Sequence, residues 1–198
     1  SRSAWLGAFA FSMQVYCDFA GYSLTALGVA KMFGFHLPAN FEAPFSSVGI
    51  VELWTRWHIS LSTWLRDYVF NPLGHYRHGR WRGYVNVLIT FTVCGLWHGA
   101  AWHFVIWGAL HGLMLIAERI LKGHFGMWAL WRKPLARVSL ALLTLALFSL
   151  AVVFFRAPTL QLAWERFHAM FGRAAVGAQT LIWNGESLTC ALALGFGL

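Results

Sequence analysis

The chain has 198 residues, of which 59% are hydrophobic and 11% charged, and its formal net charge is +8 at pH 7. Soluble domains average about 25% charged residues, so this composition predicts an integral membrane protein instead. The basic residues lie mostly in short loops between apolar runs, as in the cytoplasmic loops of membrane proteins, which argues against nucleic acid as a partner. The three cysteines include no C-x-x-C pair and predict neither a disulfide framework nor a thiolate metal site.

The first part of the chain predicts membrane helix followed by a loop. Residues 3–35 are apolar apart from Asp18 and Lys31, and they predict one long helix or two short ones that break near Gly21. Asp18 has two interpretations. In a functional one, it lines a site as a polar residue or its carboxylate orients a histidine. In a structural one, it forms a buried ion pair that holds two helices together. Residues 36–50 hold two prolines and predict a loop.

Residues 52–71 predict an amphipathic helix that lies in the membrane interface or dips into the membrane. Its apolar side chains recur at spacings of three and four and include His58, whereas most charged side chains fall elsewhere. The basic turn of residues 74–82 follows. His75 and His78 in this turn are poor metal ligands, because three arginines surround them and no acid or thiol is nearby, so we expect no metal site.

Residues 83–117 form an uncharged stretch that holds three histidines. One helix of this length would extend about 50 Å at 1.5 Å per residue, beyond a bilayer core of roughly 30 Å. Basic residues flank both ends, so if both flanks are cytoplasmic the stretch must return as a hairpin or re-entrant pair, bent between Gly95 and Ala101. G-x-x-x-G spacings bracket His98 and His111, which predicts that both are enclosed by protein.

The last part of the chain predicts three further segments. Residues 138–155 have the length and composition of a structural membrane span. Residues 160–171 predict a short amphipathic helix, and residues 172–198 lead into another span. The chain begins and ends in hydrophobic sequence without an initiator Met, so we expect a single membrane domain over residues 1–198 that is part of a longer protein, with no separate soluble domain.

Two histidines are candidates for chemistry, because His58 in W-H-I-S and His98 in L-W-H-G share a tryptophan-flanked setting. Burial favours the neutral imidazole, which is a competent general base. A lone histidine in a membrane helix more often only satisfies hydrogen bonds, so this alternative stays open. Cys94 lies four residues before His98 and could carry an acyl group, but burial raises the pKa of a thiol and favours a packing role.

Four segments together resemble the membrane-bound O-acyltransferase family. They are QVYCDFAGYSLTALGVAKMFGFHLPANFEAPF, LWTRWHISLSTWLRDYVFNPLG, NVLITFTVCGLWHGAAWHFVIWGALHGLML and VVFFRAPTLQLAWERFHAMFG. Within the family the resemblance is to the alginate O-acetyltransferase type, over about residues 14–173. It implies the C-terminal part of an all-α, polytopic transmembrane helical bundle in the bacterial inner membrane. In this fold, interfacial amphipathic and re-entrant helices enclose a tunnel.

The resemblance also implies site residues. His98, the histidine of L-W-H-G, corresponds to the catalytic residue, and His58 to a second functional polar group in or near the tunnel. Thr55 and Leu24 depart from the family pattern, which has Arg and Asp there, and this weakens any carry-over of charge contacts at those two points. Further candidates for substrate or tunnel contacts are Trp57, Arg56, Arg66, Asp67, Asp18, Trp97 and Cys94.

The activity that the resemblance implies is transfer of an acetyl or other short acyl group to an exported polysaccharide such as alginate. The donor would be a cytoplasmic thioester such as acetyl-coenzyme A, attracted by the basic loops of residues 77–82 and 132–137, with no tightly bound cofactor. His98 would take the hydroxyl proton, and either His58 or a tryptophan N–H would hydrogen-bond the oxyanion. A periplasmic esterase-like partner and the export machinery would complete the transfer.

Three alternatives to this activity stay open. The same fold carries out D-alanyl transfer to teichoic acids. A haem-binding or transport protein would use His58 and His98 as axial ligands or as a proton relay. A purely structural membrane subunit would use them only for packing.

Overall fold

The computed structural model describes residues 2–125 and 133–173, and all regular structure within them is helical. This confirms the predicted all-α class for the described part of the chain. The further span predicted over residues 172–198 lies outside it from residue 174 onward. The elements are α1 (Arg2–Met32), η1 (Pro44–Ser46), α2 (Ile50–Arg56), α3 (Ile59–Leu65), the π-turn η2 (Arg66–Phe70), α4 (Arg80–His98), α5 (Trp102–Phe125), α7 (Pro134–Arg156) and α8 (Leu160–Met170).

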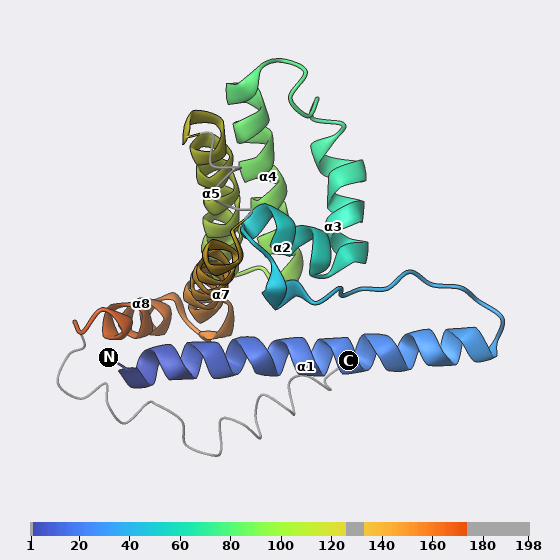
Figure 1. The fold of residues 1–198 in the computed structure, drawn as a ribbon, viewed down its shortest axis with the longest axis horizontal. Coiled ribbons are helices and arrows are strands. Elements are labelled where there is room, and N and C mark those ends of the chain that lie inside the picture. The colour runs from blue at the N-terminus through green and yellow to red at the C-terminus, as the bar shows by residue number, and fades with distance from the viewer. Residues whose placement is uncertain (1, 126–132, 174–198) are drawn as a thin grey trace.

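α4 and α5 form an antiparallel hairpin, which Figure 1 shows standing above α1. The two helices are separated only by residues 99–101, so the predicted break between Gly95 and Ala101 is confirmed. A Cβ on Gly95 would collide with the carbonyl oxygen of Phe104, and one on Gly108 with the carbonyl oxygen of Phe91. The glycine spacings therefore serve close helix contact. That both flanks of the hairpin face the cytoplasm stays a prediction.

α5 and α7 are the two helices of the described ranges that are long and apolar enough to cross a membrane. The qualifying segments, Trp102–His124 and Pro134–Arg156, have 23 residues each. At 1.5 Å per residue each extends roughly 35 Å, which matches a bilayer core of about 30 Å. α7 begins with Pro134, a residue whose fixed φ angle suits the first turn of a helix.

α1 is a single helix of 31 residues that continues through Gly21. Of the two predicted forms, the one long helix is therefore the correct one. In Figure 1 it runs crosswise beneath α4 and α5, and it packs against α7. The hydroxyl groups of Ser12 and Ser149 share a hydrogen bond of 2.9 Å inside this contact, where both side chains are fully buried. This polar pair fixes how α1 is placed along α7.

The prediction of one continuous helix over residues 52–71 is wrong, because the chain breaks at His58. His58 takes a left-handed backbone conformation with φ 46°, and α3 begins at the next residue. Asn40 of the preceding loop causes the restart: its carbonyl oxygen accepts from the Ile59 N–H at 3.0 Å, and its side-chain oxygen accepts from the Ser60 N–H at 3.2 Å. Of the predicted apolar side, Trp54, Trp57, Leu61 and Leu65 are nevertheless buried, whereas Trp64 and Tyr68 are exposed.

The first turn of α2 is held by side chains of α5 and α7. The N–H of Val51 donates to the Glu118 carboxylate at 3.0 Å, and the N–H of Gly49 donates to the Thr144 hydroxyl at 2.8 Å. These contacts satisfy backbone donors that a helix leaves free at its start. Gly49 has φ 114°, and a Cβ there would collide with the Glu118 carboxylate. α2 is thus fixed against α5, and this determines where Trp54 lies.

Candidate active site

The structure brings together the two histidines that were predicted to be catalytic. His98 is the last residue of α4, and His58 lies at the break between α2 and α3. Trp97 contacts both, with ring centroids 4.8 Å from His98 and 6.0 Å from His58. Phe19 of α1 covers His58 at 4.6 Å. Residues that are 40 positions apart in the sequence therefore border one indole ring.

Aromatic side chains surround His98, which is half-buried. The ring of Trp107 meets it edge-on at 5.1 Å and 90°, and the ring of Phe155 at 5.0 Å and 83°. Both neighbours present apolar surface and cover part of the imidazole. A neutral imidazole in such a setting is an effective general base.

His58 is a second uncharged imidazole in the same place. Burial lowers its pKa to about 4, so the ring is neutral at pH 7. Its Nδ1 atom is buried and has no hydrogen-bond partner in the part of the chain that the structure describes. Its left-handed φ of 46° is uncommon for a residue other than glycine, and strained backbone of this kind gathers at functional sites.

A third histidine, His111 of α5, extends the site inward. His111 is fully buried, and its Nδ1 accepts a hydrogen bond of 3.3 Å from the Trp54 indole N–H. The Trp107 ring lies between the two histidines, 4.9 Å from His111 and 5.1 Å from His98. We call this group the histidine cluster; its members are His58, His98, His111, Trp54, Trp97 and Trp107.

Sequence reasoning did not assign Trp54, Trp107 or His111 to the site. The spacing of four residues between Trp107 and His111 was a usable signal, because it places both on one face of a helix. The contact with Trp54 depends on how α2 packs against α5, so no local pattern predicts it.

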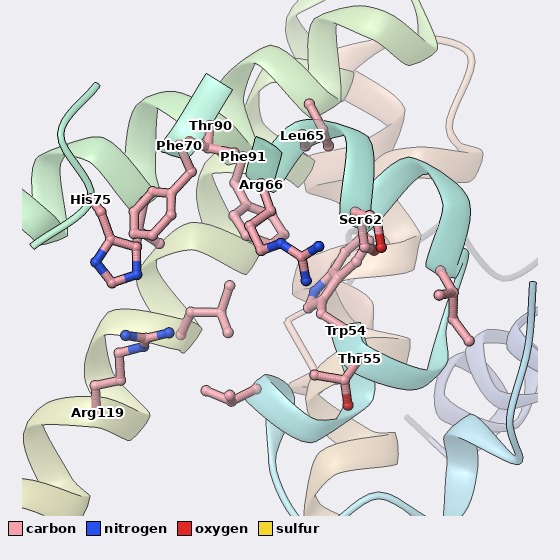
Figure 2. Close-up of a pocket in the computed structure, with 15 residues that line it drawn as sticks. Trp54, Thr55, Ser62, Leu65, Arg66, Phe70, His75, Thr90, Phe91 and Arg119 are labelled. Atoms are coloured by element: carbon pink, nitrogen blue, oxygen red, sulfur yellow. The ribbon is translucent and has the colours of Figure 1, made fainter. Parts of the chain in front are cut away.

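Trp54 also lines a pocket of about 350 Å³. Figure 2 shows Arg66 pointing into this pocket, with His75 and Arg119 on the wall across from Trp54. Four hydroxyl residues, Thr55, Ser62, Thr63 and Thr90, and several apolar side chains complete the lining. Two guanidinium groups in a partly apolar pocket suit a ligand that has both an anionic and an apolar part.

None of the charged residues predicted as contacts forms an ion pair with a histidine of the cluster in the described ranges, although Arg66 shares its pocket with Trp54. Arg56 pairs with Glu52 on the same helix at 2.7 Å. Arg66 pairs with Asp67 at 2.9 Å, and this hydrogen bond lowers the pKa of the Asp67 carboxyl. Asp18 is exposed on α1 and forms no ion pair with any described residue, so the structure shows neither a buried ion pair nor a contact that would orient a histidine.

Trp57 and Cys94 belong to the core. Trp57 is 6% exposed and packs against Phe148 and Phe41, at ring distances of 4.9 Å and 5.1 Å. Cys94 is completely buried, which favours the packing role over that of a nucleophile. Within residues 2–125 and 133–173, no three side chains of the histidine, cysteine or carboxylate type are placed to hold a metal ion.

Comparison with known proteins agrees with the motifs at this site. The sequence profile of the membrane-bound O-acyltransferase family (MBOAT) matches residues 2–155. Over 85% of the chain, the sequence is 46% identical to a probable alginate O-acetylase of Azotobacter vinelandii and 38% identical to a peptidoglycan O-acetyltransferase of Helicobacter pylori. It is also 36% identical to a teichoic acid D-alanyltransferase of Streptococcus thermophilus, over 54% of the chain and 28% of that protein.

The matched region is only part of these relatives. It spans 32% of the length of both the alginate O-acetylase and the peptidoglycan O-acetyltransferase, or about a third of each. The family match nevertheless covers most of the chain, including His58, His98 and His111. The chain therefore belongs to the membrane-bound O-acyltransferase family.

Proposed function

We propose that the full-length protein is a membrane acyltransferase that moves an acetyl group from a thioester donor on the cytoplasmic side to a hydroxyl group of an exported polysaccharide. The observation that carries this proposal is the position of His98, a half-buried imidazole at the turn of the α4–α5 hairpin with aromatic walls around it. The similarity to alginate and peptidoglycan O-acetyltransferases supports both the acyl group and the acceptor class.

His98 acts as the general base in this proposal. It takes the proton of the attacking hydroxyl while that oxygen forms a bond to the thioester carbonyl carbon. The resulting oxyanion collapses, the carbon–sulfur bond breaks, and the leaving thiolate takes the proton from the imidazolium. The products are an O-acetyl ester and a free thiol. General-base assistance of this kind accelerates a reaction by about 100- to 10,000-fold.

His58 is the second polar group of this mechanism. Its neutral imidazole contacts Trp97, as His98 does, and we place it as a hydrogen-bond partner of the incoming hydroxyl compound. The covering ring of Phe19 limits the access of water on that side. His58 therefore orients the acceptor in this proposal, while His98 removes its proton.

The pocket lined by Arg66 and Arg119 is where we place the polar end of the donor. Coenzyme A and the prosthetic group of a carrier protein both carry phosphate groups, and arginine binds phosphate through paired hydrogen bonds. The basic residues Arg77, Arg80 and Arg82 lie in the turn before α4 and at its start and add positive charge along the chain. Because Trp54 lines this pocket and also binds His111, the donor pocket borders the histidine cluster.

The acceptor side of the proposal includes a partner protein. As in the systems that the motifs resemble, an esterase-like protein of the periplasm would receive the acyl group or pass it to the polysaccharide. We also place the protein in the bacterial inner membrane as a multi-pass protein. The two described helices that can span a membrane support a membrane location of this kind.

The transferred group is identified by analysing the exported polysaccharide. Cells that lack the gene and cells that express the full-length protein are grown in parallel, and esters are released from the polysaccharide with mild alkali. The proposal predicts acetate that depends on the protein. Release of D-alanine in place of acetate would assign the protein to the D-alanyl transferases, which the chain matches over a shorter region.

A further inference from the structure

Besides His103 Nδ1, two buried side-chain nitrogens of α5 that lie on neighbouring rings have no hydrogen-bond partner among the residues that the structure describes. They belong to Trp107 and His111, which are 4% and 0% exposed, and their unpartnered atoms are Nε1 and Nε2 respectively. Proteins pair nearly all buried polar groups, and each one left unpaired costs about 1–3 kcal/mol. Two such atoms on neighbouring rings therefore indicate an occupant that the described residues do not supply.

The hydrogen bond from Trp54 determines what His111 offers to that occupant. The Trp54 indole can only donate, so Nδ1 of His111 must be the acceptor in their 3.3 Å contact. In a neutral imidazole the other ring nitrogen then carries the hydrogen, so Nε2 is a donor. The Trp107 indole is also a donor only. The missing partner must therefore be a hydrogen-bond acceptor, such as an oxygen atom.

The position of the two donors relates them to His98. The ring centroids of Trp107 and His111 are 4.9 Å apart, and Trp107 meets the His98 ring edge-on at 5.1 Å. The Trp107 ring thus contacts both His98, the proposed base, and His111, the second donor. Phe155, in contact with both His98 and Trp107, closes this side with apolar surface.

We propose that Trp107 Nε1–H and His111 Nε2–H bind the carbonyl oxygen of the acyl group and form the oxyanion hole of the reaction. This inference rests on the proposed function and extends it. When the hydroxyl oxygen adds to the carbonyl carbon and its proton passes to His98, the negative charge collects on the carbonyl oxygen and is held by the two N–H groups. When the adduct collapses, the oxyanion electrons reform the C=O bond and the electrons of the carbon–sulfur bond leave with the thiolate, which takes the proton from His98. Trp54 is a positioning residue, because it holds the His111 tautomer that donates.

The kinetic test uses full-length protein with membrane levels matched. Trp107→Phe keeps the ring and removes the N–H, and His111→Phe removes the imidazole donor. Loss of one oxyanion donor lowers kcat by about 100- to 1,000-fold, so we expect loss of this order with little change in the donor KM. Trp81→Phe, at an 81% exposed position of α4, and His124→Gln, at an exposed position of α5, are the matched controls and should retain full rates.

A spectroscopic test separates an oxyanion hole from a structural role. The probe is acetyl-coenzyme A labelled with ¹³C at the carbonyl, bound to the His98→Gln variant so that the thioester stays intact. We expect its carbonyl stretching frequency to be lowered in this variant and to return toward the solution value in His98→Gln/Trp107→Phe. Normal turnover by Trp107→Phe, or a carbonyl band that is the same with and without the Trp107 N–H, would overturn the inference. The second result would show that the donors hold an internal water.

The outcomes for this inference and for the proposed function are distinguishable. If His98→Gln loses activity while Trp107→Phe and His111→Phe keep it, only the oxyanion hole is wrong. If His98→Gln keeps full activity, the assignment of His98 as the base is wrong, whatever the other two variants show.

Discussion

Gly108→Ala tests the close contact between α4 and α5 on which the candidate site depends. A Cβ at Gly108 would collide with the carbonyl oxygen of Phe91 and would lie 3.1 Å from the backbone nitrogen of Gly95. Both atoms belong to the backbone of a regular helix and cannot rotate away as a side chain would. The two helices must therefore move apart to admit one methyl group.

The expected magnitude follows from two opposing terms. Overpacking of a tightly packed contact costs about 1–3 kcal/mol. Replacing glycine by alanine inside a helix gains up to about 1 kcal/mol. A Cβ added to Gly123 of the same helix would meet no atom within 4 Å, so Gly123→Ala isolates the favourable term. We expect Gly108→Ala to lower the free energy of unfolding by about 1–2 kcal/mol and Gly123→Ala to leave it equal or higher.

The assay compares thermal unfolding of the full-length wild-type protein and both variants in the same detergent. The Tm should fall for Gly108→Ala alone. Because separated helices also move Trp107 away from His98, O-acetylation should fall with it. If Gly108→Ala proves as stable and as active as Gly123→Ala, the hairpin tolerates an extra methyl group and the reasoning from close helix contact is refuted.

Three further predictions concern α2, His58 and the haem alternative. Gly49→Ala should lower the Tm more than Gly79→Ala, because both positions have positive φ but only the Cβ at Gly49 collides with Glu118; equal losses would remove the role of that contact. His58 should contribute a fall of about 1–2 kcal/mol in the free energy of unfolding, with solvent screening allowed for, between pH 6.5 and pH 4, because the unfolded state takes up a proton at His58 before the folded state does. A His58→Gln variant with the same pH dependence as wild type in thermal scans would contradict this. Purified active protein should show no strong visible absorption band, whereas a Soret band lost in His58→Ala would favour haem ligation.

The helical hairpin could be predicted because its determinants are local. The uncharged stretch of residues 83–117 is too long for one span, and its glycines mark both the break after His98 and the contact between the helices. The enclosure of His111 followed from the same spacing and is confirmed by its complete burial. Length, charge and glycine spacing were sufficient for these features.

The break at His58 could not be predicted from the sequence. The apolar periodicity continues through residues 52–71, so a local pattern favours one helix there. The restart of α3 instead depends on Asn40, a loop residue 18 positions before His58 that caps the new helix. A tertiary hydrogen bond of this kind leaves no periodic signal, and His58, at the break, contacts Trp97.

The inner part of the site shows the same limit. Resemblance to known motifs pointed to His58 and His98, which share Trp97 in the structure. It did not point to the hydrogen bond between Trp54 and His111, which requires α2 to be fixed on α5 through Glu118. Donors without acceptors are visible only once burial and partners are known.

The most direct test of the central claim is the O-acetyl content of the exported polysaccharide in cells that carry full-length protein with His98→Gln, compared with wild type and with His124→Gln at matched membrane levels. His124 is exposed at the end of α5, so its substitution controls for the loss of a histidine as such. We predict that His98→Gln abolishes O-acetylation and that His124→Gln preserves it. Normal O-acetylation in the His98→Gln cells would show that His98 is a packing residue and would contradict its role as the catalytic base.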